Sequence, residues 1–345
     1  MKKLLGMALV LLALTGCTAL DGDARQSFER ERAANAELLA LQDRLENVSG
    51  VDSATVDIRP PFTAVDEKAS TDDHLEIRVT MREVDLDRFV EVGALARGAV
   101  ESGPLATSDH RVIIVAEGRE ALRLNRIPDT DQLLLESLEY WQGVRSLVDP
   151  AVSLTVDVGG FGAIFSRIIT APEDTPQITA EYTDAFAEIA AIPDATASLP
   201  IVELTGLRLI GELPPGAVME TFGRLIPNIK LFVTMNESRH IGHVSLEWHD
   251  VPNDRTGAVY TVSAIQDLRG GEEDLIDVAR ELAASAVGPT SVQSYLPQHE
   301  GSLRFDCDPS EAFGQSIELV EWLVAQGVPL TVADNAGFCS LVESR

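Results

Sequence analysis

The stretch GAVYTVSAI at residues 257–265, followed by EEDLIDVARELAA at residues 272–284, decides the fold class. In the first segment apolar side chains occupy every second position, which predicts a β-strand with one buried face. In the second segment the apolar residues recur every three or four positions, which predicts an amphipathic helix over 272–286. A strand followed by such a helix indicates a helix that packs on a sheet.

The same pattern continues towards the C-terminus. Asp308 is a suitable N-cap, Pro309 fits the first turn, and Glu311 occupies the capping-box position of a second helix. From residue 257 onwards the expected order is strand 257–265, helix 272–286, strands 291–295 and 302–307, helix 308–326 and strand 328–333, with a last strand near 338–342. The order β-α-β-β-α-β is that of ferredoxin-like domains with their split βαβ arrangement.

The rest of the chain alternates between the same two periods. The first helix should bury one face, formed by Leu38, Leu41, Leu45 and Val48. The elements expected up to residue 127 are helix 30–48, strands 51–59 and 74–83, helix 86–101, and strands 111–116 and 121–127. Those expected up to residue 250 are helices 131–146, 178–191 and 215–225 and strands 151–158, 163–170, 229–235 and 243–249.

We therefore expect an α+β protein of tandem helix-on-antiparallel-sheet units of the ferredoxin-like (split βαβ) type. The 345 residues exceed what one typical hydrophobic core organises. The expected segments are a signal peptide (1–16), a lipidated cysteine with a flexible stalk (17–29), a first α+β unit (30–128), a middle α+β unit (129–252) and a C-terminal ferredoxin-like unit (257–345).

The N-terminus carries an export signal. Met1-Lys2-Lys3 is a short positive start, and the apolar run from Leu4 to Leu14 would span about 16 Å as a helix, too short to cross a membrane. The run ends in Leu14-Thr15-Gly16-Cys17, which resembles the lipobox of bacterial lipoproteins. This resemblance implies cleavage before Cys17 and a diacylglycerol-cysteine with an added acyl chain such as palmitate. The alternative is an ordinary signal peptide with a chance cysteine.

The expected location is the extracytoplasmic face of a cell membrane, with the lipid as the anchor. Thr18 is not the aspartate that retains lipoproteins at the inner membrane of diderm bacteria, so a diderm host would place the protein at its outer membrane. After processing only Lys68 and Lys230 remain as lysines, a bias typical of GC-rich genomes such as those of actinobacteria.

Charge and cysteine content narrow the possible partners. The formal net charge of −28 argues against nucleic acid and against anionic lipid surfaces. With Cys17 lipidated, Cys307 and Cys339 remain, and an even pair in an oxidising compartment predicts a disulfide. Its loop of about 33 residues would contribute roughly 3–4 kcal/mol of stability. The alternative is two buried free thiols.

Residues 30–127 are similar to the small helix–strand modules called BON domains, in which a helix ends at a Gly-Val turn into a strand. The similarity depends on Gly50-Val51 within the segment LENVSGVDSATV at residues 45–56. It implies an association with the cell envelope or with phospholipid surfaces. The acidity of this chain departs from that role.

Histidines and carboxylates gather at residues 240–250. In a strand that starts at His243, one face carries Val244, Leu246 and Trp248, and the other carries His243, Ser245, Glu247 and His249. Glu247 and His249 would lie about 6.6 Å apart and could share a metal, whereas His243 lies about 20 Å from His249. The other ligands would come from elsewhere in the chain. The alternative is the solvated face of an antiparallel strand.

Other candidate motifs have simpler explanations. Asp306, Asp308 and Glu311 fit helix capping better than a calcium loop. The segment Gly159-Gly160-Phe161-Gly162 lacks the Lys-Ser/Thr ending of a P-loop and is expected to be a turn. No nucleophile elbow, His-Glu-x-x-His or Ser-x-x-Lys motif set is present in the sequence.

These observations favour a membrane-anchored extracytoplasmic lipoprotein that has no enzymatic activity, needs no cofactor, and binds a protein partner or a small ligand, or serves as a structural protein, in the envelope. One alternative is an envelope hydrolase or metal-dependent enzyme that uses the strand from His243 to His249. Another is a solute-binding component of a transporter, although that role normally requires two larger α/β lobes.

Overall fold

The structure is a computed structural model. It describes residues 32–59, 74–102, 104–106, 110–158, 164–172, 176–193, 199–226, 243–250, 257–263, 268–285, 290–305 and 317–330. The chain forms two compact units, residues 1–131 and residues 132–345.

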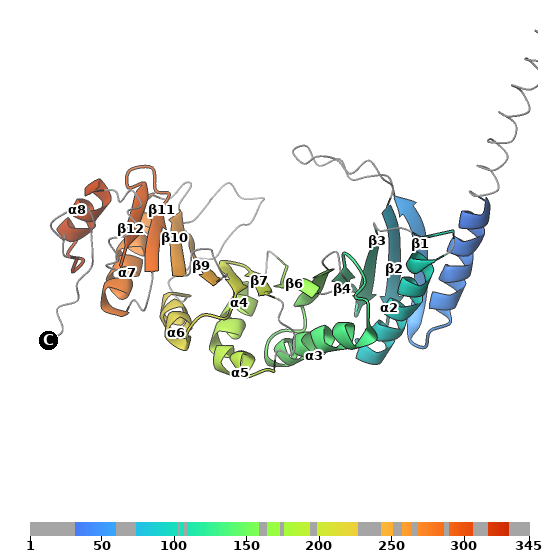
Figure 1. Cartoon of the computed structure of the whole chain (residues 1–345). Helices are drawn as coiled ribbons and strands as arrows, with labels where there is room; N and C mark the ends of the chain where they lie inside the picture. Colours follow the sequence, from blue (N-terminus) through green and yellow to red (C-terminus); the bar gives the residue numbers. More distant parts are fainter. Residues whose placement is uncertain are drawn as a thin grey trace, which may run out of the picture. The chain divides into compact units, whose positions relative to one another are not determined.

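The first unit has the order α-β-β-α-β-β, as the sequence predicted. Its elements are a helix over residues 32–46, β1 (Val51–Arg59), β2 (His74–Met81), α2 (Leu86–Glu101), β3 (His110–Ala116) and β4 (Arg119–Leu124) (Figure 1). The strands pair in sequence order: β1 with β2 and β3 with β4 are antiparallel, and β2 with β3 is parallel. Asp85 caps α2, because its side chain accepts a hydrogen bond from the Arg88 backbone N–H at 3.1 Å.

The second unit continues with the same kind of elements. They are α3 (Asp131–Leu147), β5 (Ser153–Val158), β6 (Ile164–Thr170), α4 (Pro176–Asp184), α5 (Phe186–Ala190), β7 (Leu199–Leu204), β8 (Leu207–Gly211), α6 (Gly216–Leu225), β9 (His243–Asp250), β10 (Gly257–Ser263), α7 (Leu268–Ser285), β11 (Thr290–Ser294), β12 (Gly301–Arg304) and α8 (Ile317–Ala325). α3 begins at the boundary between the two units.

The strands of the second unit pair in sequence order with a regular alternation. The pairs β5–β6, β7–β8, β9–β10 and β11–β12 are antiparallel. The pairs β6–β7, β8–β9 and β10–β11 are parallel, and helices lie between the partners in sequence. Antiparallel neighbours need only a turn, whereas parallel neighbours need a crossover. Each repeat is therefore a hairpin followed by a helical crossover, and the first unit shows the same repeat.

The α+β class expected from the sequence is confirmed, but the ferredoxin-like arrangement is not. A split βαβ unit places another strand between its two parallel strands. In this protein β10 and β11 are direct parallel neighbours from Ala258–Thr290 to Val262–Ser294. In addition, β9 and β10 pair with each other, so the expected middle and C-terminal units share one sheet.

The hydrophobic core lies between the sheet and its helices. In the second unit α7 packs against β9, β10 and β11 (Figure 1). Every second residue of these strands points to this side and is buried: Val244, Leu246, Trp248, Ala258, Tyr260, Val262, Thr290, Val292 and Ser294. The buried face predicted for the strand from His243 is therefore confirmed for Val244, Leu246 and Trp248.

Several predictions concern residues outside those that the structure describes. These are the lipobox with Cys17, the residues Cys307 and Cys339, the capping segment Asp308–Glu311, Gly159–Gly162, and the strands 229–235 and 338–342. The strand expected at 328–333 is described only up to residue 330, and that part is not a strand. Within the described ranges, no helix has the length and apolarity needed to span a bilayer.

Candidate functional site

The sheet of the second unit has a second face that its helices do not bury. On β8 to β11 the residues that alternate with the core positions are half-buried or exposed, which leaves them accessible to solvent. They are Arg208, Ile210, Ser245, Glu247, His249, Gly257, Val259, Thr261, Ser291 and Gln293. We call this side of the sheet the open face.

One row of the open face runs without interruption across β5 to β12. Its members are register partners on successive strands: Ser153, Thr170, Glu203, Arg208, Glu247, Val259, Ser291 and Arg304. The three central members alternate in charge, with Arg208 between Glu203 and Glu247. Neighbouring strands lie about 4.8 Å apart, so these three side chains are within reach of one another.

The central members form a polar cluster with His249. Arg208 Nε lies 3.5 Å from Glu203 Oε1, and Arg208 Nη1 lies 3.5 Å from Glu247 Oε1. His249 Nε2 lies much closer to Glu247 Oε1, at 2.5 Å. The side chains of Glu203, Arg208, Glu247 and His249 are 46%, 51%, 40% and 28% exposed. Ion pairs that are this exposed contribute little to stability, so stability alone does not account for the cluster.

A hollow of about 250 Å³ opens beside this cluster. It lies at the tip of the β7–β8 hairpin, where β9 extends past the turn. Its walls are Glu203, Leu204, Gly206, Leu207, Arg208, Ser245, Leu246 and Glu247. The turn is fixed against β9, because the Leu246 backbone N–H donates a hydrogen bond to the Gly206 carbonyl at 2.9 Å. The hollow is smaller than the roughly 300–1,000 Å³ of pockets that enclose small molecules.

An apolar row lies next to the charged row on the open face. Ile168, Ile201 and Ile210 are register partners on β6, β7 and β8, and the partner of Ile210 on β9 is His249. All three isoleucines are half-buried. The open face therefore combines an apolar stripe with a polar cluster beside it, and protein interfaces likewise combine an apolar centre with a polar rim.

The helices on the other side of the sheet are much more acidic. The acidic residues of α3 to α8 that are exposed or half-buried are Asp131, Glu136, Glu139, Glu181, Asp184, Glu188, Glu220, Glu272, Glu273, Asp274, Asp277, Glu281, Glu318 and Glu321. The same helices contain four arginines in sequence, Arg145, Arg224, Arg269 and Arg280. On the described open face Asp157, Glu203 and Glu247 are nearly balanced by Arg208 and Arg304. The negative charge is thus concentrated on the helix layer.

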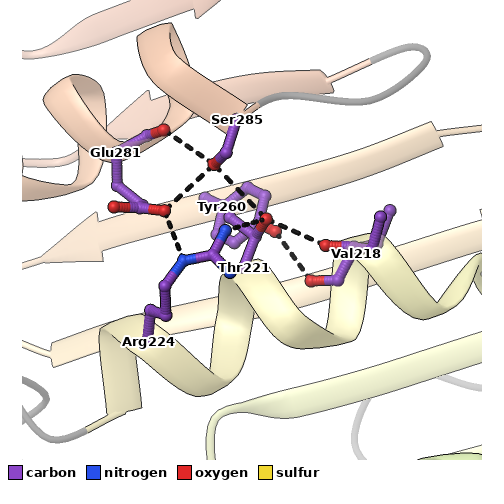
Figure 2. A network of polar contacts seen from close by, with 7 residues as sticks. Val218, Thr221, Arg224, Tyr260, Glu281 and Ser285 are labelled. Atoms are coloured by element: carbon purple, nitrogen blue, oxygen red, sulfur yellow. Dashed lines mark hydrogen bonds and ion pairs between the residues drawn. The ribbon is translucent and has the colours of Figure 1, made fainter.

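Helices α6 and α7 are held together by a polar network (Figure 2). Arg224 Nε lies 2.6 Å from Glu281 Oε1, which also accepts a hydrogen bond from Ser285 Oγ at 3.0 Å. Thr221 Oγ1 accepts from Arg224 Nη2 at 3.0 Å. Burial raises the pKa of the Tyr260 hydroxyl beneath this network. The network holds α6 and α7 in place over β10, on the side of the sheet opposite to the open face.

The structure brings together the two residues that the sequence suggested as metal ligands. Glu247 and His249 do lie side by side, but they contact each other, and Arg208 shares the same carboxylate oxygen. Within the described ranges no group of three or more His, Cys, Asp or Glu residues is arranged to hold a metal. The backbone of His243 pairs with that of Ser263, at the opposite end of β9 from His249.

Sequence reasoning missed the two strands that complete the cluster. No strand was expected at β7 or β8, so neither Glu203 nor Arg208 was considered. A usable signal was present, because Thr205-Gly206 separates two short runs of apolar alternation, IVEL and LRLIG. Gly206 adopts φ +74°, a left-handed conformation that glycine supplies at turns without steric cost.

Comparisons with known proteins give no relative for this chain: no family model, no curated protein and no solved structure matches it.

Proposed function

We propose that this protein is a lipid-anchored, extracytoplasmic binding protein without enzymatic activity, and that it docks a protein partner on the open face of its second unit. The observation that carries the proposal is the open face itself. It combines a continuous row of register partners, an in-register isoleucine stripe and a charged hollow on one sheet. Repeat proteins commonly use such extended, regular surfaces for binding.

The distribution of charge supports the open face as the docking side. An acidic helix layer repels the anionic surfaces of an envelope and keeps the protein soluble. The open face is nearly balanced, so it can be desolvated against a partner at lower cost, and its isoleucines provide apolar area.

The size of the hollow favours a protein partner over a small solute. At about 250 Å³ it would not enclose a drug-sized ligand, as a solute-binding component must. Glu247, which a metal-dependent hydrolase would use, is engaged with His249 and Arg208. Both facts place the enzyme and transporter hypotheses behind the docking hypothesis.

The lipid anchor belongs to the same proposal and is supported by the sequence motif at Leu14–Cys17. We expect mass spectrometry of the N-terminal peptide to show acyl chains on Cys17. Cys17→Ser should release the protein from the membrane fraction. An unmodified Cys17 in the processed protein would contradict this part of the proposal.

The docking function is tested by site-specific photocrosslinking in intact cells. A photoreactive side chain replaces Ile201 on the open face or, as a control, the exposed Glu220 on α6. The proposal predicts a reproducible crosslinked protein from position 201 and not from position 220. If neither position gives a reproducible product, or if both give the same one, the open face is not the docking side.

A further inference from the structure

The hollow on the open face also indicates the chemistry of the partner, and the following inference rests on the function proposed above. The hollow is open to solvent, and its walls include the Leu204–Leu207 turn, Arg208, and Ser245 and Glu247 of β9. Its volume suits a single inserted side chain, and pockets that accept one anchor residue are where binding energy concentrates in protein interfaces.

Carboxylates outnumber cations around the hollow. Glu203 and Glu247 line it together with one guanidinium, that of Arg208. Arg208 reaches each carboxylate only at 3.5 Å, which is the limit of a hydrogen bond. Both of these contacts, and that of His249, use the Oε1 atoms. Among the described residues neither Oε2 atom contacts a donor, so both can accept hydrogen bonds from an incoming group.

The charge of the whole chain also favours a cationic partner. A net charge of −28 attracts cationic partners over distances longer than the hollow itself. Because the open face is nearly neutral and carries few positive charges, a cationic partner can approach it without removing water from many charges of its own sign. A basic side chain is the group that suits both the long-range field and the local carboxylates.

We propose that the hollow receives one basic side chain, an arginine or a lysine, from a cationic protein partner. The inserted cation binds at the Oε2 atoms of Glu203 and Glu247, next to Ser245, while Arg208 keeps its place between the two carboxylates. Arg208 limits the affinity because it carries the same charge as the inserted side chain. It also disfavours an apolar side chain in the hollow, because such a side chain would remove water from the Arg208 guanidinium without replacing it by a hydrogen bond. The guanidinium of an arginine is the better fit, since it can engage two carboxylates at once.

The test uses the full chain in a nonionic detergent and a fluorescein-labelled peptide of alternating glycine and arginine. A peptide with citrulline in place of arginine controls for charge. Fluorescence anisotropy measures binding near physiological salt, about 0.15 M, where long-range attraction is screened. The site variant is Glu203→Gln with Glu247→Gln. The matched control is Glu188→Gln with Glu220→Gln, two exposed helix residues whose loss changes the net charge equally.

The site variant should weaken binding of the arginine peptide about tenfold, and the control variant less than about threefold. The citrulline peptide should bind neither the site variant nor the control variant. Arg208→Gln should strengthen binding several-fold, because it removes the like charge, and this result does not depend on whether the double variant folds. Equal weakening by the two double variants, or weaker binding by Arg208→Gln, overturns the proposal.

Failure of this inference is distinguishable from failure of the proposed function. If photocrosslinking from position 201 succeeds while the peptide ignores the hollow, the basic anchor is wrong and the docking face stands. If the peptide binds as expected but position 201 gives no crosslink in cells, the docking function fails although the hollow binds cations.

Discussion

Gly211 lies so close to β9 that a Cβ atom added to it would meet the carbonyl oxygen of Asp250 at 1.8 Å. These two residues are register partners at the end of the parallel pair β8–β9. The Glu212 N–H donates to the same carbonyl at 3.2 Å, and the Glu212 carbonyl accepts from the Trp248 indole at 2.8 Å. Gly211 therefore fixes the approach of the two strands that carry Arg208 and Glu247.

Gly211→Ala should lower the free energy of unfolding by about 2–4 kcal/mol. The added methyl group overlaps backbone that cannot move away, and the φ of +92° is strained for any residue with a Cβ atom. Gly216→Ala is the control, because a Cβ there meets nothing within 4 Å. It should change stability by less than about 1 kcal/mol, in the stabilising direction because Gly216 begins α6. Denaturant unfolding measures both, and equal effects would contradict the close approach.

Arg224 and Glu281 should couple α6 to α7. Their side chains are 49% and 28% exposed, and Glu281 is also held by Ser285, so a double-mutant cycle to alanine should give a coupling of about 0.5–1 kcal/mol. The Arg280–Asp277 pair within α7, with exposures of 51% and 50%, is the matched control. It should give no more than about 0.5 kcal/mol. A control coupling as large as the first would show that the network of Figure 2 does not join the helices.

Two tyrosines should make the protein sensitive to alkali. Burial raises the pKa of Tyr182 well above its ordinary value, and burial likewise raises the pKa of Tyr260. In the unfolded chain both ionise near pH 10. Since the pKa of each hydroxyl is higher in the folded state than in the unfolded chain, each buried tyrosine makes a contribution to the free energy of unfolding that depends on pH. This contribution is complete below about pH 10 and is lost as the pH rises above it.

Phenolate absorbance tests this directly. In the native protein just above pH 10, Tyr182→Phe and Tyr260→Phe should leave the absorbance change unchanged, because neither hydroxyl ionises there. In the unfolded protein each substitution should remove one tyrosine's share of the signal. A reduced native signal in either variant would show that its hydroxyl is accessible.

The Cys307–Cys339 disulfide stays a prediction from the sequence. A peptide map without reductant should recover the two cysteines in one crosslinked fragment. Cys307→Ser and Cys339→Ser should each lower stability by roughly 3 kcal/mol, and the double variant should lose no more than either single one. Additive losses, or two thiols that are alkylated in the unfolded protein without reductant, would favour the free cysteines.

The sequence predicted the element types well where apolar spacing was regular. The two faces of β9 are the clearest case, since period-two alternation alone assigned Leu246 and Trp248 to the core and Glu247 and His249 to the other side. Strand order was not predictable in the same way, because adjacency depends on pairing between distant segments. Hence the element order around β10 and β11 suggested a split βαβ unit, whereas the two strands pair directly.

The candidate site was only half visible in the sequence. Glu247 and His249 were found through their spacing, but Arg208 and Glu203 belong to a hairpin that the proline-rich segment before it obscured. Arg167 is a further example, because a charged residue in a strand suggests exposure. The structure buries it to 1% exposed with its guanidinium 4.8 Å from the Tyr140 ring on α3, a contact that depends on tertiary packing.

The central claim is that the open face, and not the helix layer, is covered in the cell envelope. Cysteine accessibility tests it without knowledge of the partner. Single cysteines replace Ile201 or Thr261 on the open face and Glu188 or Glu220 on the helices. Each is labelled with a hydrophilic maleimide in intact cell envelopes and in purified protein, with the parent chain as background. We expect both open-face positions to label several-fold more slowly in envelopes than in purified protein, and both helix positions to label equally in the two. Equal labelling of the open-face positions in envelopes and purified protein would contradict the claim.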